Sequence, residues 1–387
     1  MSSRHEKDFF KSRREWSRLK HRILAYYLEP WATKLGSRHA SIFVVDAFAG
    51  AGSYGDPLTG TTVDGSPVIE VTRAEAYEAS HPGRRMEVIC VERNSVHFAS
   101  LRDRIGSSPA KPTLIHGDFT AHAAAIATRM GNAPALILLD PIGIKPISAD
   151  ACDPLLFRSG QTDVFIILHF AVVHRAGGML DGSGGAKPSL PRAAALASTI
   201  DRFFRTDEWR QVAANPNFKA ADRDDRYLNL YFAAVLGERY RYKSAYRVRA
   251  SYWAGTRYWL VHASSHRDGI ELMNDAIVSV DLDLLERSSR IQGDEDVLPG
   301  FEATPAKDRT DAIERRVRER LLKILAGSGA KGMLFGDLKG QLFDEFFGRA
   351  KTGVSARYMK QLVREGVLTR EDRASAGPRD DERILIV

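Results

Sequence analysis

The sequence predicts a doubly wound α/β domain followed by a smaller helical module. Short apolar runs, most of them ending in an acidic residue, alternate with segments of helical periodicity, a pattern typical of a parallel sheet covered on both faces. A glycine-rich stretch follows the first of these runs, and the chain turns polar well before its end. At 387 residues the chain is long enough for two such parts.

Composition restricts the class of protein and its partners. Hydrophobic residues make up 44% of the chain and charged residues 27%, which is ordinary for a globular protein. The formal net charge of +7 favours a polyanionic partner. Two cysteines, Cys90 and Cys152, exclude a disulfide framework and any cysteine-rich metal or iron–sulfur site built from this chain alone. We therefore expect no metal site, a reducing cytoplasm, and, from the charged residues 1–14, neither a signal peptide nor a membrane span.

The first apolar run leads into a glycine-rich turn. Residues 42–45 are aromatic and aliphatic, and Asp46 ends the run. Gly50 and Gly52 allow a tight turn and let a ligand approach the backbone closely. A nucleotide-type pocket is the prediction, and a plain turn without a ligand is the alternative.

A helix is predicted before this turn, over residues 16–35, because its apolar residues recur at helical spacing. Lys20 lies on that helix between the apolar positions. It is placed to reach a cofactor carboxylate or a substrate phosphate, although a solvated or helix-pairing lysine is the open alternative.

The next two predicted strands also end in acidic residues. Residues 86–91 end at Glu92, an arrangement with which nucleotide-binding sheets hold ribose hydroxyls. A third strand leads to Asp118 and Phe119, where the carboxylate is suited to an adenine amine and the ring to packing on adenine. Each residue alone also fits a strand-end cap.

The fourth and fifth predicted strands supply the candidates for chemistry. Residues 135–139 lead to Asp140 and Pro141, and the carboxyl ends of parallel strands meet at one crevice. Asp140 is therefore the first choice for the reaction centre. His169 follows the fifth strand and is suited to act as a base or a substrate contact, or to serve structurally.

Later segments extend this domain. Residues 176–190 are rich in glycine and predict a surface loop or lid. Residues 246–249 and 258–263 predict late, antiparallel strands.

The predicted domains are residues 1–286, a polar linker over 287–309, and a module over 310–387. Three helical segments and a closing hairpin in that module are the pattern of a winged helix. Its third helix carries the candidate nucleic-acid contacts Arg357, Lys360 and Arg364. Neighbouring acidic residues leave a protein-docking role equally open.

Taken together, the motifs resemble those of the three-Cys-motif partner protein family, TcmP, which is similar to class I S-adenosylmethionine-dependent methyltransferases. The resemblance spans most of residues 16–280 and is carried by Lys20 to Leu24 with Tyr27 and Trp31, Asp46 to Tyr54, Gly65 to Pro67, Val91-Glu92, Gly117 to Phe119, Leu139 to Gly143, and Tyr258 to Met273 with His266 and Gly269.

The resemblance implies a Rossmann-like methyltransferase sheet with S-adenosylmethionine as cofactor and a reaction centre at Asp140 and Pro141. It further implies a partner protein with a three-cysteine motif, similar to radical S-adenosylmethionine enzymes. The predicted cofactor contacts are Lys20, Asp46, Phe48, Gly50, Gly52, Ser53, Glu92, Asp118, Phe119 and Asp140.

One departure concerns the acceptor. Adenine amino-methyltransferases carry Asp-Pro-Pro-Tyr at the fourth strand end, where the ring stacks the flipped base, whereas this chain has Asp-Pro-Ile-Gly. Adenine specificity is therefore in doubt, and RNA, DNA, protein and small molecules all stay open as acceptors.

Three functions compete. The first is a methyltransferase, and the second is a catalytically silent, cofactor-binding adaptor that docks a metal-binding partner through its winged helix. The third is an NAD-dependent oxidoreductase, which is disfavoured because the turn lacks the third glycine of the dinucleotide motif.

Overall fold

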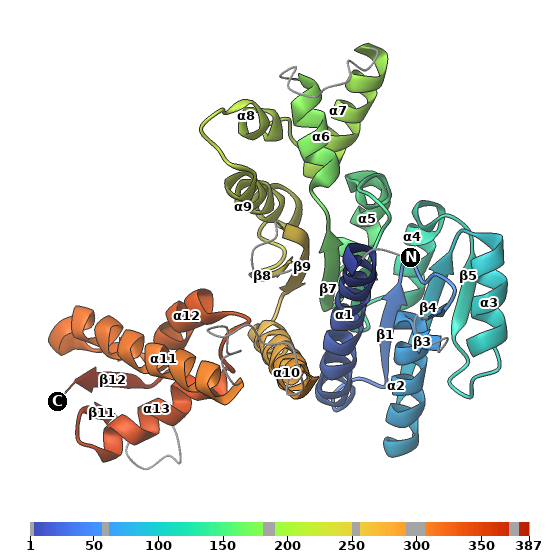
Figure 1. The fold of residues 1–387 in the computed structure, drawn as a ribbon. Helices are drawn as coiled ribbons and strands as arrows, with labels where there is room; N and C mark the ends of the chain where they lie inside the picture. The colour runs from blue at the N-terminus through green and yellow to red at the C-terminus, as the bar shows by residue number, and fades with distance from the viewer. Residues whose placement is uncertain are drawn as a thin grey trace. The chain divides into compact units, whose positions relative to one another are not determined.

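The computed structural model describes residues 4–55, 62–180, 190–249, 256–291, 306–370 and 379–386. The chain divides into two compact units, Met1–Ile270 and Glu271–Val387, which are drawn in Figure 1.

The first unit is built on a seven-stranded sheet. Its order is β5-β4-β1-β6-β7-β9-β8. Neighbours from β5 to β7 pair in parallel, while β9 pairs antiparallel with both β7 and β8. The strands are β1 (Ser41–Asp46), β4 (Arg85–Glu92), β5 (Thr113–His116), β6 (Ala135–Leu139), β7 (Thr162–Leu168), β8 (Tyr242–Arg249) and β9 (Thr256–Ser264). The predicted doubly wound sheet and its late antiparallel strands are confirmed.

This order reverses direction at β1. The chain moves outward from β1 through β4 to β5 and then returns to β6 on the other side of β1. In open sheets of this kind ligands bind outside the carboxyl ends of the strands, at the point of reversal. Asp46, the last residue of β1, pairs in register with Cys90 of β4 and Leu138 of β6. We use the term carboxyl edge for the end of the sheet at which the parallel strands β1, β4, β5, β6 and β7 finish.

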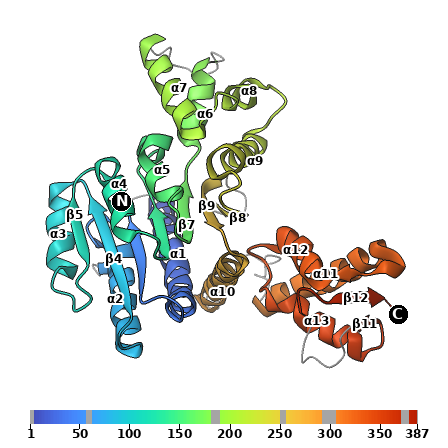
Figure 2. The same cartoon turned by 180° about the vertical axis from the view of Figure 1, so that it is seen from behind.

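Helices cover both faces of the sheet (Figures 1 and 2). Helices α1 (Arg4–Gly36) and α2 (Ser66–Ser80) pack on one face, and α3 (Ser95–Ile105) packs beside α2. Helices α4 (Phe119–Met130) and α5 (Ala149–Leu156) pack together on the other, where alternate residues of β1 and β6 join the main hydrophobic core.

A helical insertion separates β7 from β8. It comprises α6 (Ala171–Leu180), α7 (Leu190–Phe204), α8 (Trp209–Ala214), α9 (Ala220–Leu230) and a π-helical turn, η2 (Tyr231–Leu236). Its aromatic side chains, among them Phe203, Phe204 and Tyr227, are buried and extend the main core.

A buried aspartate fixes α1 to the sheet. Asp163 of β7 is 2% exposed and accepts hydrogen bonds from the Tyr27 hydroxyl at 2.9 Å and the Trp31 indole N–H at 2.8 Å. Asp163 lies near the start of β7, whereas Lys20, earlier on α1, contacts Asp140 at the carboxyl edge. Helix α1 therefore runs antiparallel to β7 and carries Lys20 to the carboxyl edge.

The second unit is a small helical module with its own hydrophobic core. Three strands form an antiparallel sheet in the order β10-β12-β11. Its elements are most of α10 (Arg267–Ile291), α11 (Ala306–Ser328), a 3-10 turn η3 (Gly329–Lys331), β10 (Met333–Leu334), α12 (Phe335–Phe346), α13 (Gly353–Arg364), β11 (Leu368–Arg370) and β12 (Arg383–Ile386).

Several predicted boundaries differ from the structure. The units divide after Ile270 rather than after residue 286, because α10 from Glu271 onward packs with the second unit. Both ends of the expected linker are wrong, since 287–291 continue α10 and 306–309 begin α11, while 292–305 lie outside the described residues. In the predicted loop 176–190, residues 176–180 are helical and 181–189 are likewise not described.

Smaller loops and short elements complete the first unit. A short hairpin pairs β2 (Ser53–Gly55) with β3 (Thr62–Asp64), directly after the glycine-rich turn, and a 3-10 turn, η1 (Lys145–Ile147), precedes α5.

Candidate functional site

The glycine-rich turn after β1 is held by the neighbouring strand. Gly50 has φ +66° and Gly52 has φ +75°, in the left-handed region that favours glycine. The Gly50 N–H donates to a Glu92 carboxylate oxygen at 2.8 Å, and the Gly52 carbonyl accepts from the Gly65 N–H at 3.0 Å. A side chain built at Gly50 would meet only the Tyr54 hydroxyl within 4 Å. The turn therefore leaves room for close approach to its backbone.

Asp46 lies at the base of this turn. Its carboxylate is fully buried and accepts hydrogen bonds from the Phe48 N–H at 3.0 Å and the Ser66 hydroxyl at 2.6 Å. Burial raises the pKa of Asp46 to about 6, and the nearby charge of Asp140 adds to the rise. The Gly65-Ser66-Pro67 segment thus supports the strand end from the start of α2.

The Glu92 and Asp118 carboxylates follow the next two strands. The second oxygen of Glu92 accepts from the Asn94 N–H at 2.5 Å, so this side chain ties the glycine turn to the start of α3. Asp118 caps α4 by accepting from the N–H and hydroxyl of Thr120. These bonds lower the pKa of Asp118. A carboxylate oxygen can accept two hydrogen bonds, so both side chains retain capacity for a ligand.

An ion pair joins α1 to the end of β6. The Lys20 ammonium contacts the Asp140 carboxylate, and the two side chains are 17% and 23% exposed. The partners are 120 residues apart in the chain. Lys20 therefore lies at the carboxyl edge, where its partner is Asp140.

His169 and Tyr258 lie beside this pair. The His169 ring nitrogen Nδ1 is 3.1 Å from the Arg257 carbonyl oxygen, and its ring is 5.6 Å from that of Tyr258. Burial lowers the pKa of His169, while the charge of Asp140 opposes that shift. The same carboxylate contributes to raising the pKa of Tyr258, after burial. Asp140, His169 and Tyr258 therefore belong to one electrostatic cluster.

Sequence reasoning missed His21, Tyr54 and Tyr258 as members of the site. The rings of His21 and Tyr54 stack with centroids 5.8 Å apart. Burial lowers the pKa of His21 to about 4, and the Lys20 charge adds to that effect. Burial and then the charges of Asp46, Asp140 and Glu92 raise the pKa of Tyr54 to about 12. All three residues lie in the sequence stretches that carry the family resemblance. No local pattern distinguishes them from ring-bearing side chains that only pack in a core.

Phe119 occupies a different place from the predicted one. It is the first residue of α4, is 2% exposed, and packs against Phe48 with ring centroids 5.4 Å apart. Its ring belongs to the main core, so packing on an adenine is not available to it without rearrangement. Phe48, on the edge of that core, is only partly buried.

The segment after Asp140 is open. Pro141 is buried, whereas Ile142 is fully exposed and Gly143 has φ +93°. Ser53 begins β2 and is only partly buried. The structure thus gathers most of the predicted site at one edge, with the exception of the Phe119 ring.

The candidate nucleic-acid residues lie on α13 of the second unit. Arg357 forms an ion pair with Glu314, which raises the pKa of Arg357, while Lys360 and Arg364 line a shallow hollow with it. Arg318, Arg320 and Arg370 are also paired with glutamates. Acidic partners therefore offset much of the positive charge of this unit.

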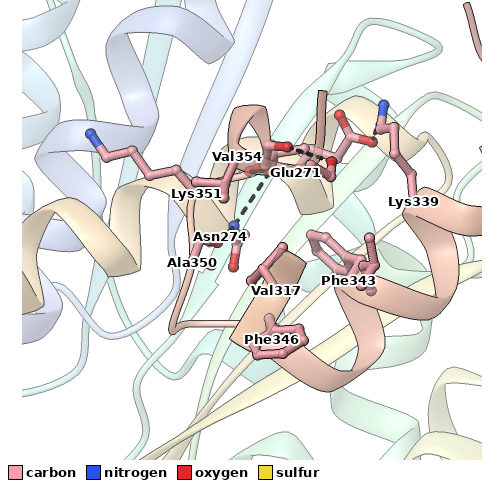
Figure 3. Close-up of a pocket in the computed structure, with 12 residues that line it drawn as sticks. Glu271, Asn274, Val317, Lys339, Phe343, Phe346, Ala350, Lys351 and Val354 are labelled. Carbon is pink, nitrogen blue, oxygen red and sulfur yellow. Dashed lines mark hydrogen bonds and ion pairs between the residues drawn. The ribbon is translucent and has the colours of Figure 1, made fainter. Parts of the chain in front are cut away.

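Figure 3 shows a small cavity in the second unit. It holds about 30 Å³, enough for one or two water molecules. Asn274 donates to the Ala350 carbonyl at 2.9 Å, and Lys339 pairs with Glu271 at 3.2 Å. We interpret it as a packing defect beside a polar contact rather than a ligand site.

The described ranges contain neither a metal-binding cluster nor a membrane-spanning helix. No group of three or more His, Cys, Asp or Glu side chains there is arranged to hold a metal ion. In the same ranges, none of the helices combines the length and apolar character needed to cross a membrane.

Comparison with known proteins gives structural matches only. No family model and no curated protein sequence matches the chain. An O-methyltransferase from Bacillus cereus in complex with S-adenosylhomocysteine is 14% identical, with 62% of this chain and 80% of that one covered and a TM-score of 0.28. A methyltransferase from Geobacter sulfurreducens, also with S-adenosylhomocysteine, is 14% identical, with coverages of 60% and 88% and a TM-score of 0.24.

A protein from Legionella pneumophila is similar over a smaller region. It is 14% identical, with 38% of this chain and 67% of that one covered and a TM-score of 0.29. TM-scores this low carry no conclusion about fold or activity. The fold class therefore rests on the strand order and register of the chain itself.

Proposed function

We propose that the first unit is an S-adenosylmethionine-dependent methyltransferase domain. The observation that carries the proposal is the glycine turn held open by Glu92 beside buried Asp46, at the point where the sheet reverses. Gly50 and Gly52 both adopt left-handed conformations, and the space beside Gly50 is open except for the Tyr54 hydroxyl, which suits close approach of a nucleoside-containing ligand there. A seven-stranded, mostly parallel sheet is also in keeping with a Rossmann-like methyltransferase fold.

In this proposal one group of residues at the carboxyl edge binds the cofactor and another group faces the acceptor. Asp46, Phe48, Gly50, Gly52 and Ser53 would hold the cofactor along the turn. On the neighbouring strands Glu92 would accept from the ribose hydroxyls and Asp118 from the adenine amine, as predicted from the sequence. The cofactor supplies the methyl group, and the chain's own contribution is mainly alignment, which lowers the barrier for a displacement reaction.

The acceptor side is the cluster around Asp140. Lys20 contacts this carboxylate, the charge of Asp140 acts on His169 and Tyr258, and the next residue, Pro141, is buried. Asp140, the first candidate for the reaction centre, would orient the acceptor. Lys20 would hold the Asp140 carboxylate in place or bind a carboxyl group of the cofactor. A dehydrogenase is disfavoured because the turn does not carry the third glycine of the dinucleotide motif.

The second unit supports a further candidate function. We propose that it is a winged helix, since its elements follow the order α11-β10-α12-α13-β11-β12 and the three strands form one antiparallel sheet. Its paired arginines favour docking of a protein over broad contact with nucleic acid. By resemblance to TcmP, the docked protein would carry a three-cysteine motif, and the chain would then serve as a cofactor-binding adaptor.

Calorimetry tests the cofactor assignment. Titration of S-adenosylhomocysteine, S-adenosylmethionine and NAD into the full chain should give binding only with the first two. Glu92→Ala should weaken that binding by about 1–3 kcal/mol, since the ribose hydroxyls of the ligand lose their hydrogen-bond acceptor. Glu87→Ala is the matched control, because Glu87 lies on the same strand and pairs with Arg129. Unchanged affinity in folded Glu92→Ala protein would remove Glu92 from the site.

Methyl transfer separates an enzyme from an adaptor. A chain that binds S-adenosylhomocysteine but transfers no label from S-adenosylmethionine, alone or with a three-cysteine-motif protein, would be an adaptor.

A further inference from the structure

The hydrogen bond of His169 fixes its tautomer. Nδ1 lies 3.1 Å from the Arg257 carbonyl oxygen, and a carbonyl oxygen only accepts. Nδ1 therefore carries the proton whenever the ring is neutral. Nε2 then holds a basic lone pair, as a general base requires.

The surroundings of His169 keep its ring neutral and place one carboxylate near it. Burial lowers its pKa, so the ring is neutral near pH 7. The groups that act on the ring are Asp140 after β6, Arg257 and Tyr258 on β9, and Lys20 on α1. The two cations oppose protonation, whereas the Asp140 carboxylate favours it. Asp140 would stabilise the imidazolium once it forms.

The segment directly after Asp140 does not carry the aromatic side chain that stacks a flipped adenine in amino-methyltransferases. Ile142 and Gly143 occupy the positions of the proline and aromatic residue that stack a flipped adenine in amino-methyltransferases. Ile142 is fully exposed and Gly143 brings no side chain. A general base adds little to methylation of such an amine, but it assists a nucleophile that must lose a proton, such as a hydroxyl.

We propose that the acceptor is a hydroxyl group and that His169 is its general base, an inference that rests on the proposed methyltransferase function. The acceptor oxygen forms a bond to the methyl carbon as the methyl–sulfur bond breaks. The electron pair of that bond stays on sulfur, leaving S-adenosylhomocysteine. The hydroxyl proton passes to Nε2 of His169 and is later released to water. The reaction needs no oxidant or reductant.

The test uses the full chain with S-adenosylmethionine labelled in the methyl group. Three probes are supplied: ribosomal RNA, which offers ribose hydroxyls and exocyclic amines together, catechol, and adenosine. Products are digested and separated to distinguish O-methyl from N-methyl linkages. We expect label in O-methyl linkage. Label in N-methyladenine, or none in any probe although S-adenosylhomocysteine binds, overturns the inference while leaving cofactor binding intact. Failure to bind S-adenosylhomocysteine overturns the proposed function itself.

A variant tests the role of His169. His169→Asn keeps an N–H donor for the Arg257 carbonyl but removes the base. The rate should fall about 100-fold or more, with S-adenosylhomocysteine affinity unchanged. The native rate should rise with pH as His169 loses its proton and level off by neutrality, and this acid limb should vanish in the variant.

The control is His81→Asn. His81 also places Nδ1 near a backbone carbonyl, that of Tyr77 at 3.0 Å, but it ends α2 far from the carboxyl edge. Its variant should keep the native rate and pH profile. An equal rate loss in both variants, or an acid limb that persists in His169→Asn, would remove His169 as the base.

Discussion

Asp46 and Asp163 are both fully or almost fully buried aspartates of one sheet, yet they do different things. Asp163 accepts from two side chains of α1, the Tyr27 hydroxyl and the Trp31 indole. Asp46 accepts from a turn backbone and a serine, and it lies close enough to Asp140 for the two charges to interact. Burial raises the pKa of each. The contrast teaches that a buried carboxylate acquires its role from its donors, helix docking in one case and site construction in the other.

The largest expected effect is on stability, through Asp163. Asp163→Ala leaves the Tyr27 and Trp31 donors buried without their acceptor, which should cost roughly 2–6 kcal/mol of unfolding free energy. Tyr27→Phe keeps the Trp31 donor, although it also removes the contact of the Tyr27 hydroxyl with His262 at 3.1 Å, and should cost less. Urea unfolding measures both. An Asp163→Ala protein as stable as the native chain would show that the hydrogen bonds do not dock α1.

The next effect is a dependence of the unfolding free energy on pH that comes from Asp46. Its pKa of about 6 in the folded chain exceeds the ordinary value of 3.8. The folded state therefore holds the proton more tightly, and the associated stability is present below about pH 4 and lost as pH rises through about 6. The loss is up to about 3 kcal/mol. Asp46→Asn should flatten this slope between about pH 4 and 7 in urea unfolding. Parallel slopes in both proteins would contradict the assignment.

Asp140 should affect turnover more than cofactor binding. Asp140→Asn keeps the shape but removes the charge that faces Lys20 and His169. Methyl transfer should fall roughly 100-fold, a typical loss when one electrostatic group is removed from a reaction centre. S-adenosylhomocysteine affinity, measured by calorimetry, should stay near the native value. Asp201→Asn, in the helical insertion, is the control. Native turnover in Asp140→Asn would make Asp140 a strand cap.

Elements set by local pattern were predictable from the sequence. The alternation of apolar runs and helices determines the sheet, and Asp46, Glu92 and Asp140 mark strand ends because each follows an apolar strand. The module over 310–387 contains the three predicted helical segments, as α11, α12 and α13. The predicted polar linker was partly wrong because charged residues at 287–291 and 306–309 are fully compatible with helix.

Contacts between distant residues were not predictable. Lys20 meets Asp140 across 120 residues, and His169 meets the backbone of Arg257 across 88. These pairings follow from the place of β9 between β7 and β8 and from the direction of α1, neither of which a single sequence specifies. An aromatic residue after a strand end predicts packing on a ligand, which is the role expected of Phe119. In the structure Phe119 begins helix α4, and its ring packs in the main core.

The smallest expected effect concerns the cations of α13 in the second unit. There too, the role of a charged side chain depends on the groups that pair with it. Arg357 is already paired with Glu314, whereas Lys360 and Arg364 stand on the same hollow of α13. If this helix contacts nucleic-acid phosphates, the affinity of the full chain for a duplex DNA or RNA should fall as salt rises. The slope of log affinity against log salt then counts the phosphates neutralised.

Replacing Lys360 and Arg364 by Ala should flatten that slope by about one unit each, because each contacts a phosphate at most once. Arg357→Ala should change it less, since its charge is already offset by Glu314. Arg320→Ala, whose guanidinium pairs with Glu345 at 2.7 Å, is the matched control and should leave the slope unchanged. Filter binding over a salt series measures all four proteins. Equal slopes in every variant, or binding that does not depend on salt, would assign α13 to protein docking, because the net charge of a paired surface then attracts no polyanion.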